Sequence, residues 1–334
     1  MTEHQPPLLI FTYPRTASNL LMRMLAIPDQ EHAVAVESGG YFFMPAIRKM
    51  RELKMLDRPS TEWTDAQWAE LKDTYTTCTQ SLQDLLQTAD ATGRVAVFKE
   101  HTPFIASPTV QASFVQQTES PDQPWRVNLA ENYCVSNVSP ELDLPYNETV
   151  IPAEFLLNCV SAFLIRHPAL AFPSYYRVMQ TFQGKDGNMD DVESALKEAL
   201  TLRWSRNLYD CPRRVPIILD ADDLLTNPEL SLHFCELAGL DPSKVRFEWD
   251  PMANEQLEKE DPIRRRTRST LFASSGISPG KTFHGLTIEG EIIKWTAEFG
   301  ECASSKLERW VRMAMPDYEY LAGRRLRLPR ATDV

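Results

Sequence analysis

Short apolar runs alternate along the chain with segments whose apolar residues recur every three or four positions. The clearest such segment is residues 65–88, and it predicts an amphipathic helix. Further helices are predicted at 190–210, 228–238, 289–299 and 301–315. The apolar runs predict buried strands at Leu8–Phe11, Val95–Phe98, Val160–Ile165 and Val215–Leu219. Strands alternating with helices in this way predict a three-layer α/β/α fold, in which helices cover both faces of a central parallel sheet.

The 334 residues are long enough to bury a sizeable core, and we expect a single domain over 1–334. Residues 103–152 differ from the rest because they are rich in proline and serine with weak periodicity. A long irregular segment inside a compact domain is usually functional, so a lid or substrate-binding insertion is predicted here. Its aromatic residues, which we expect to face an apolar acceptor, are Phe104, Phe114, Trp125 and Tyr133.

The first apolar run leads through a polar turn into a helical pattern between Leu8 and Leu25. A helix N-terminus presents unpaired N–H groups and the positive end of its dipole, which suit a phosphate. Thr16, Ser18 and Asn19 add hydroxyl and amide groups, and Arg15 adds a charge. Because threonine, serine and asparagine are also common N-cap residues, these residues alone leave two interpretations open: an anion cradle or an ordinary capped helix.

Polar side chains also follow the other three apolar runs. Lys99, Glu100 and His101 come after the second run, and Arg166 after the third. Ligands of open parallel sheets bind beyond the carboxyl ends of the strands, so these groups are expected near the first loop. After the fourth run, Asp220, Asp222 and Asp223 suggest either a metal site or a helix cap, and we favour the cap and predict no metal.

Charge and composition exclude several classes of function. The formal net charge of −11 argues against nucleic-acid binding, which needs a basic face. No signal peptide or membrane-spanning run is evident, so we expect a cytoplasmic protein that acts on a small molecule without a membrane partner. The six cysteines lack a CxxC pair, which favours reduced thiols over disulfides or zinc. The oligomeric state is left open, a homodimer included.

Three stretches, in chain order, resemble the cytosolic sulfotransferase family. TYPRTASNLL (12–21) resembles the family's 5′-phosphosulfate loop, usually YPKSGTTW, and VFKEHTP (97–103) resembles its KTHLP segment. IRHPALAFPSYYR (165–177) resembles its 3′-phosphate motif, in which serine follows arginine by eight positions, as Ser174 follows Arg166. Residues 220–224 resemble its YEDL segment, and residues 272–280 its FxRKGxxG loop. The resemblance implies a P-loop NTPase-like sulfotransferase fold.

The resemblance further implies sulfuryl transfer from 3′-phosphoadenosine 5′-phosphosulfate (PAPS) to a hydroxyl of a small, apolar or phenolic metabolite, leaving 3′-phosphoadenosine 5′-phosphate (PAP). His101 would be the general base, while Arg15 and Lys99 would stabilise negative charge. Arg166 and Ser174 would hold the 3′-phosphate. The other nucleotide contacts implied by the resemblance are Arg15, Thr16, Ala17, Ser18, Asn19, Ser274, Ser275 and Gly276. The basic run Arg264–Arg268 is either a solvated surface or, as the resemblance implies, part of a loop that closes over the 3′-phosphate.

The chain departs from the family pattern within the nucleotide site. Arginine replaces the usual lysine at 15, and alanine replaces glycine at 17, which we expect to require a negative φ at Ala17. Leu20 stands where a tryptophan is usual and Ala221 where a tyrosine is usual, while Ser274 and Ser275 replace a basic pair. Two alternatives therefore stay open: the same fold used as a lyase or dehydratase, or a non-catalytic nucleotide or metabolite binder.

Overall fold

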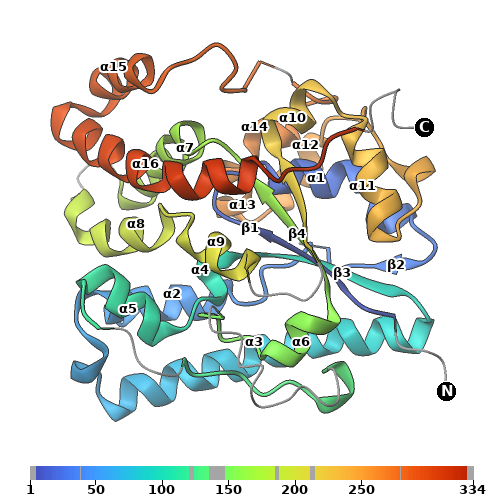
Figure 1. Ribbon diagram of the computed structural model, residues 1–334, viewed down its shortest axis with the longest axis horizontal. Helices are drawn as coiled ribbons and strands as arrows, with labels where there is room; N and C mark the ends of the chain where they lie inside the picture. Colours follow the sequence, from blue (N-terminus) through green and yellow to red (C-terminus); the bar gives the residue numbers. More distant parts are fainter. Residues whose placement is uncertain are drawn as a thin grey trace.

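The computed structural model describes residues 5–37, 39–119, 124–134, 147–184, 188–210, 215–278 and 280–328. Within them, parallel strands form a sheet in the order β2-β3-β1-β4-β5, which lies between the long helix α3 (Asp65–Thr92) and α16 (Glu301–Ala322) in Figure 1. The strands are β1 (Leu8–Thr12), β2 (Ala33–Val34), β3 (Val95–His101), β4 (Val160–Ile165) and β5 (Ile217–Asp220). The predicted α/β fold with a central parallel sheet is confirmed.

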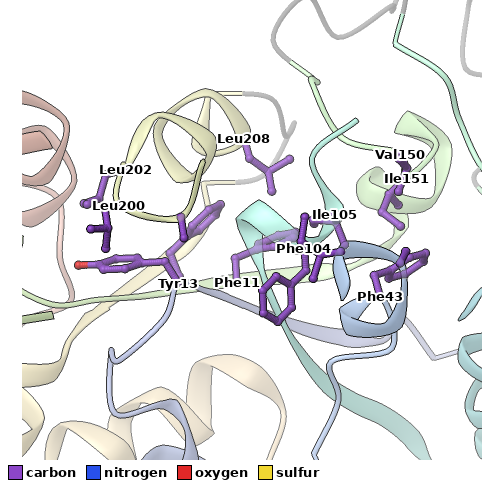
Figure 2. Close-up of a cluster of buried hydrophobic side chains, with 14 of the residues drawn as sticks. Phe11, Tyr13, Phe43, Phe104, Ile105, Val150, Ile151, Leu200, Leu202 and Leu208 are labelled. Carbon is purple, nitrogen blue, oxygen red and sulfur yellow. The ribbon is translucent and has the colours of Figure 1, made fainter. Parts of the chain in front are cut away.

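The central strand β1 contributes alternate residues to two hydrophobic cores, as the two-residue period of a strand requires. Leu8 and Ile10 pack with α1 (Ser18–Leu25) and α11 (Leu230–Ala238) on one face. Leu9 and Phe11 belong to the larger core on the other face, which contains α3, α16, α2 (Met44–Glu52) and α7 (Pro168–Gln183). Figure 2 shows Phe11 and Tyr13 within this larger core. Helices therefore cover both faces of the sheet.

Helix α3 shows how local sequence sets the ends of an element. The Thr64 hydroxyl accepts a hydrogen bond from the Gln67 N–H, and the Gln67 side chain accepts one from the Thr64 N–H, so a capping box begins the helix. Gly93 ends it in a left-handed conformation with φ 63°. The predicted helix at 65–88 is confirmed and extends to Thr92.

The predicted helix at 190–210 is wrong in one respect, because the chain breaks it into α8 (Glu193–Ala199) and α9 (Arg203–Tyr209). Leu200 and Leu202 are both buried in the larger core, beside Tyr13 in Figure 2. Residues two apart cannot face the same side of a helix, so burying both requires an extended link. Smaller differences occur at two boundaries, since Val215 lies outside β5 with 85% exposure and α16 continues to Ala322.

The described parts of residues 103–152 are more regular than their composition predicts. They contain α4 (Thr102–Ile105), α5 (Pro108–Gln116) and a 3₁₀ helix at Glu131–Tyr133, while residues 120–123 and 135–146 lie outside the described residues. Val150 and Ile151 are buried in the larger core with Phe104 and Ile105 (Figure 2). The described parts of this segment are therefore integral to the core, and whether the segment acts as a lid stays a prediction.

The remaining helices complete the two outer layers. They are α6 (Ala153–Asn158), α10 (Ala221–Thr226), α12 (Asn254–Lys259), α13 (Pro262–Thr267), α14 (Ser269–Phe272) and α15 (Ile288–Phe299). In the part of the chain that the structure describes, no helix is long and apolar enough to cross a bilayer.

Candidate active site

A cavity of about 990 Å³ opens beyond the carboxyl ends of β1, β3 and β4. Residues from the β1–α1 loop, the end of β3, and the start of the β4–α7 connection line its floor. Helices α2, α7 and α15, together with residues between 264 and 282, form its walls. The cavity therefore lies where ligands of open parallel sheets bind, and its volume suits a ligand of nucleotide size.

The β1–α1 loop has an unusual backbone. Arg15 has φ 72° and Ala17 has φ 63°, so two residues that carry a Cβ adopt the left-handed conformation within three positions. We expected a negative φ at Ala17, and this expectation is wrong. The left-handed turn lets the Ala17 carbonyl accept hydrogen bonds from the N–H groups of Leu20 and Leu21 at 2.9 and 3.1 Å. The loop thus keeps a glycine-like turn at a cost of about 1–2 kcal/mol per left-handed residue.

The start of α1 is the second feature of this loop. Ala17 is the N-cap, and no side chain among the described residues caps the helix. The hydroxyls named as possible caps are used elsewhere: Thr16 donates to the Tyr13 carbonyl, and Ser18 lies 2.7 Å from the hydroxyl of Tyr41. The first N–H groups of α1 are therefore not satisfied by a capping side chain. Of the two interpretations of the loop, this arrangement favours the anion cradle over the capped helix.

Two arginines converge on the cradle from different elements. Arg15 donates from Nε to the Ser174 hydroxyl at 2.9 Å and from Nη1 to the Thr267 carbonyl at 2.9 Å. Arg166 donates from Nη1 to the Arg15 carbonyl at 3.1 Å and from Nη2 to the Lys281 carbonyl at 2.8 Å. The acceptors of these bonds are all neutral oxygens. Burial lowers the pKa of both guanidinium groups. The charge of Arg166 lowers the pKa of Arg15 further, whereas Asp222 partly offsets the effect of burial on Arg166.

The Nε atom of Arg166 is buried and has no hydrogen-bond partner among the described residues. An unsatisfied donor on a buried cation is costly unless an anion completes its hydrogen bonding. A guanidinium group can bind two oxygens of a phosphate at once, and the Ser174 hydroxyl lies beside Arg15. Arg15, Arg166 and Ser174 therefore form a group suited to bind phosphate.

The charge of the cavity differs from that of the whole chain. Although the formal net charge is −11, the described residues that line the cavity include nine arginines and lysines and one acidic residue, Glu291. The lining cations are Arg15, Arg48, Arg51, Arg166, Arg177, Arg264, Arg268, Lys281 and Lys294. Within the basic run, Arg264 and Arg268 face the cavity, whereas Arg265 and Arg266 are exposed elsewhere. A cavity of this composition favours a ligand with several negative charges.

His101 ends β3 beside the cradle, because Thr12 of β1 and His101 pair in the parallel register. Its Nδ1 lies 2.6 Å from the Thr12 hydroxyl, and that hydroxyl donates to the Glu100 carbonyl at 3.2 Å. Since a hydroxyl has one proton, Thr12 then accepts from Nδ1–H, and this assigns the lone pair to Nε2. Burial, followed by the charges of Lys99 and Arg15, lowers the pKa of His101 well below 6.5. The imidazole is therefore neutral at neutral pH and able to accept a proton.

Lys99 lies on the same face of β3 as His101 and points toward α1. Its ammonium donates to Asn19 Oδ1 at 2.5 Å and sits 4.6 Å from the centre of the Tyr41 ring. Burial and the charge of Arg268 lower the pKa of Lys99 well below its ordinary value. Lys99 is 1% exposed and does not line the cavity directly. It reaches the cradle through Asn19.

Tyr41 is a site residue that the sequence analysis did not predict. Its ring lies 4.4 Å from that of His101, and it has φ 65°. The conformation is imposed by the Gly39-Gly40 pair: the Tyr41 N–H donates to the Lys99 carbonyl at 2.9 Å, and the Lys99 N–H to the Gly39 carbonyl at 3.0 Å. The signal in the sequence was the glycine pair followed directly by an aromatic residue. Non-glycine residues held in this conformation cluster at functional sites.

The structure brings most of the predicted site residues to one cavity. Those that line it are Arg15, Ala17, Ser18, Asn19, His101, Arg166, Ser174, Ser274 and Gly276, whereas Thr16, Lys99 and Ser275 do not. Ser275 instead offers its carbonyl to the Trp249 N–H at 3.1 Å. Lys281, which the sequence predictions missed, lines the cavity and follows a Gly-rich loop, which was the available signal. Of the four aromatics predicted to face an acceptor, Phe104 lines the cavity, whereas Phe114, Trp125 and Tyr133 pack into the core.

The acidic residues after β5 have structural partners. Asp220 caps α10 by accepting from the Asp222 N–H at 2.9 Å, and it also accepts from the Tyr318 hydroxyl at 2.8 Å. Asp222 accepts from the Phe283 N–H at 2.6 Å, and Asp223 pairs with Arg325 at 2.5 Å. The helix-cap interpretation of this segment is confirmed for Asp220.

Comparisons with known proteins place this site within a family. The chain is 38% identical over 336 residues to Sulfotransferase ppzF of Metarhizium majus (strain ARSEF 297), covering 95% of this chain and 96% of that protein. It is also 38% identical over 338 residues to Sulfotransferase ppzF of Metarhizium rileyi (strain RCEF 4871), covering 96% of each. No family model matches the chain.

Two solved structures are similar at low sequence identity. The sulfotransferase domain from the curacin biosynthetic pathway is 13% identical, with a TM-score of 0.37, over 89% of this chain and 98% of that one. The sulfotransferase domain from the Synechococcus PCC 7002 olefin synthase is 14% identical, with a TM-score of 0.37, over 90% and 97%. On the strength of the two Metarhizium relatives, which match almost the whole chain, the protein belongs to the sulfotransferase family.

Proposed function

We propose that this sulfotransferase transfers the sulfuryl group of PAPS to a hydroxyl of a small, apolar or phenolic acceptor. The observation that carries the proposal is a neutral, buried His101 that opens into a strongly cationic cavity. Cations alone would support binding of an anionic nucleotide. The adjacent uncharged imidazole adds a group that can remove the acceptor's proton, and the combination favours an enzyme over a binding protein.

The residues present fit the donor. The uncapped N-terminus of α1 and the left-handed turn at Arg15 and Ala17 suit the 5′-phosphosulfate. Arg166, with its unsatisfied Nε, and Ser174 suit the 3′-phosphate. Lys281, Arg264 and Arg268 also line the cavity, and they would supply the positive charge missing at Ser274 and Ser275. When bound, PAPS would supply an activated sulfuryl group with PAP as its leaving group.

His101 would act through Nε2. The Thr12 hydroxyl holds Nδ1–H, so Nε2 would accept the proton of the acceptor hydroxyl as the oxygen becomes the nucleophile. The low pKa of His101 makes the free base available at neutral pH. Lys99, which Asn19 holds by a hydrogen bond, would place a cation next to the cradle, and Arg15 would stabilise negative charge on the leaving phosphate. Arginine cannot release a proton at neutral pH, so Arg15 would act by charge and hydrogen bonding.

The acceptor side of the cavity is largely apolar. Tyr41 and Phe104 flank His101, with ring centroids 4.4 and 4.8 Å from the imidazole. Leu170, Val178 and Met179 of α7 line the wall beyond them. These side chains favour an acceptor with an aromatic or aliphatic body over a sugar or another highly hydrated substrate.

Calorimetric titration with PAP, using AMP as the control ligand, tests donor recognition. We expect micromolar binding of PAP, or about −8 kcal/mol, and at least tenfold weaker binding of AMP. Arg166→Ala should abolish the preference for PAP, whereas Arg246→Ala, which removes a positive charge paired with Asp29 outside the cavity, should keep it. Equal affinity for PAP and AMP in the wild-type protein would refute PAPS as the donor.

Transfer itself is tested by incubating the protein with PAPS and a phenolic acceptor and measuring PAP release with sulfated product. His101→Gln should remove turnover while leaving PAP affinity within about threefold, because the imidazole serves the acceptor proton. A variant that retains wild-type turnover would exclude His101 as the base.

A further inference from the structure

Helix α2 presents a two-part face to the cavity. Met44, Ile47, Arg48 and Arg51 follow the i, i+3, i+4, i+7 spacing that defines one side of a helix, and all four line the cavity. Three other residues of the helix do not line the cavity. Ala46 and Met50 are buried in the core, and Lys49 pairs with Glu52 and Glu70 at 3.0 and 2.7 Å. The cavity face of α2 is therefore apolar in its first turn and basic in its second.

The apolar residues of this face precede the arginines along the helix. Helix α2 begins at Met44, three residues after Tyr41, whose ring lies 4.4 Å from that of His101. At a rise of 1.5 Å per residue, Arg48 and Arg51 lie roughly 6 and 10 Å farther along the helix axis than Met44. The apolar turn is thus next to the proposed base, and the two arginines lie beyond it.

The charge at this end of the cavity is not balanced within the described residues. Arg48 is exposed and makes no ion pair or hydrogen bond there. Arg51 pairs with the buried Glu198 at 3.0 Å, but its Nε is buried without a hydrogen-bond partner. Among the described residues, one carboxylate therefore pairs with Arg51 and none pairs with Arg48. Burial also raises the pKa of Glu198 to about 7, so at neutral pH this carboxyl group carries only part of its negative charge and balances the charge of Arg51 incompletely.

Helix α7 adds several apolar side chains to the lining of the cavity, and these favour a ligand with an apolar body. Val178, Met179 and Phe182 of α7 line the cavity, and Tyr175 lies next to Arg51. The phosphate-binding arginines, Arg15 and Arg166, belong to the β1–α1 loop and the end of β4, and their printed hydrogen-bond partners lie outside α2: Ser174, Thr267, Lys281 and the Arg15 carbonyl. The arginines of α2 are thus available to a different ligand from the one that occupies the loop.

We propose that the acceptor is a hydroxylated apolar acid whose carboxylate binds Arg48 and Arg51 while its hydroxyl lies at His101. This inference rests on the proposed sulfuryl transfer, and it adds the class of the acceptor. The apolar body of such an acid would lie along Met44 and Ile47, and a carboxylate matches the two-pronged donor geometry of guanidinium groups.

The test measures binding of 3-(4-hydroxyphenyl)propanoate and of its methyl ester by calorimetry, with the protein saturated with PAP. The two probes differ in charge and share the phenol and the apolar body. Because hydrogen bonds between a guanidinium group and a carboxylate are charge-assisted, we expect the acid to bind at least tenfold more tightly than the ester. Arg48→Gln should reduce this preference to less than about threefold, since the remaining Arg51 is shared with Glu198.

Lys49→Gln is the matched control, because it removes the same charge from the adjacent residue on the outer side of α2 and should keep the full preference. Arg51→Met alone would leave Glu198 buried and unpaired, so the double variant Arg51→Met/Glu198→Leu removes both partners. We expect it to fold and to lose the preference for the acid.

Several outcomes would overturn the inference: equal binding of acid and ester, no binding of either at millimolar concentration, or an unchanged preference in Arg48→Gln. The same titrations without PAP separate this inference from the proposed function. A preference for the acid that depends on Arg48, in a protein that does not bind PAP, would refute PAPS as the donor and retain the carboxylate site. Binding of PAP without a preference for the acid would refute the carboxylate site and leave PAPS as the proposed donor.

Discussion

Gly40→Ala tests whether the turn that holds Tyr41 depends on its close contact with strand β3, which carries Lys99 and His101. A Cβ at position 40 would lie 2.1 Å from the Lys99 carbonyl oxygen and 2.7 Å from the Lys99 nitrogen. Both atoms belong to the backbone of β3, so no side-chain rotation can relieve the overlap. Gly40 also has φ 131°, a conformation that disfavours alanine.

The expected loss of stability follows from these contacts. Separating the turn from β3 removes two backbone hydrogen bonds, Tyr41 to Lys99 at 2.9 Å and Lys99 to Gly39 at 3.0 Å, worth about 1 kcal/mol each. Backbone strain adds about 1–3 kcal/mol. Gly40→Ala should therefore lower the free energy of unfolding by about 3–5 kcal/mol.

Gly93→Ala provides the matched comparison. Gly93 has φ 63°, but a Cβ there would meet no atom within 4 Å, so the substitution costs only the left-handed conformation, about 1–2 kcal/mol. Urea unfolding at 25 °C, analysed by linear extrapolation, measures both changes on the same scale. If Gly40→Ala destabilises the protein no more than Gly93→Ala, the close contact with Lys99 does not hold the turn.

Four further predictions concern the site and its supports. Because burial lowers the pKa of His101, the base stays neutral as pH falls through 6.5, so kcat should change less than about twofold between pH 8 and 6.5; a kcat that halves near pH 6.5 would contradict this expectation. Thr12→Val removes the hydroxyl that holds Nδ1 of His101, and it should lower kcat about tenfold with PAP affinity unchanged. Ala17→Gly should raise the free energy of unfolding by about 1 kcal/mol in urea unfolding, since it relieves left-handed strain, and a loss of stability would show that the strain is absent. Burial raises the pKa of Asp220 from 3.8 to about 6, so ionisation destabilises the folded protein as pH rises through that range. Relative to the wild type, Asp220→Asn should gain about 2 kcal/mol in the free energy of unfolding between pH 4 and 7, and a constant difference would refute the assignment.

The order and type of the main elements could be predicted because burial patterns are local. The apolar runs of β1, β3 and β4 mark strands buried on both faces, and the capping box at Thr64 and Gln67 marks the start of α3. The break between α8 and α9 could not be predicted, because it depends on Leu200 and Leu202 reaching the same core beside Tyr13. That requirement exists only once the sheet is assembled.

The candidate site divides in the same way. His101, Arg15 and Arg166 were predictable because each lies at or just after the carboxyl end of a strand, and parallel strands bring those ends to one edge. Ser174 lies within α7 and was predicted only from the family resemblance.

Only the tertiary structure decided the state of these groups. The bond between Thr12 and His101 assigns the imidazole proton, and burial keeps the ring neutral. The left-handed turn at Ala17 survives without glycine because the loop and α1 hold it in place. The arginines of α2 face the cavity because Ala46 and Met50 on the same helix fill the core. The sequence by itself thus determined which chemical groups meet at the sheet edge. Their protonation, backbone strain and direction depend on neighbours distant in the chain, and these only folding brings together.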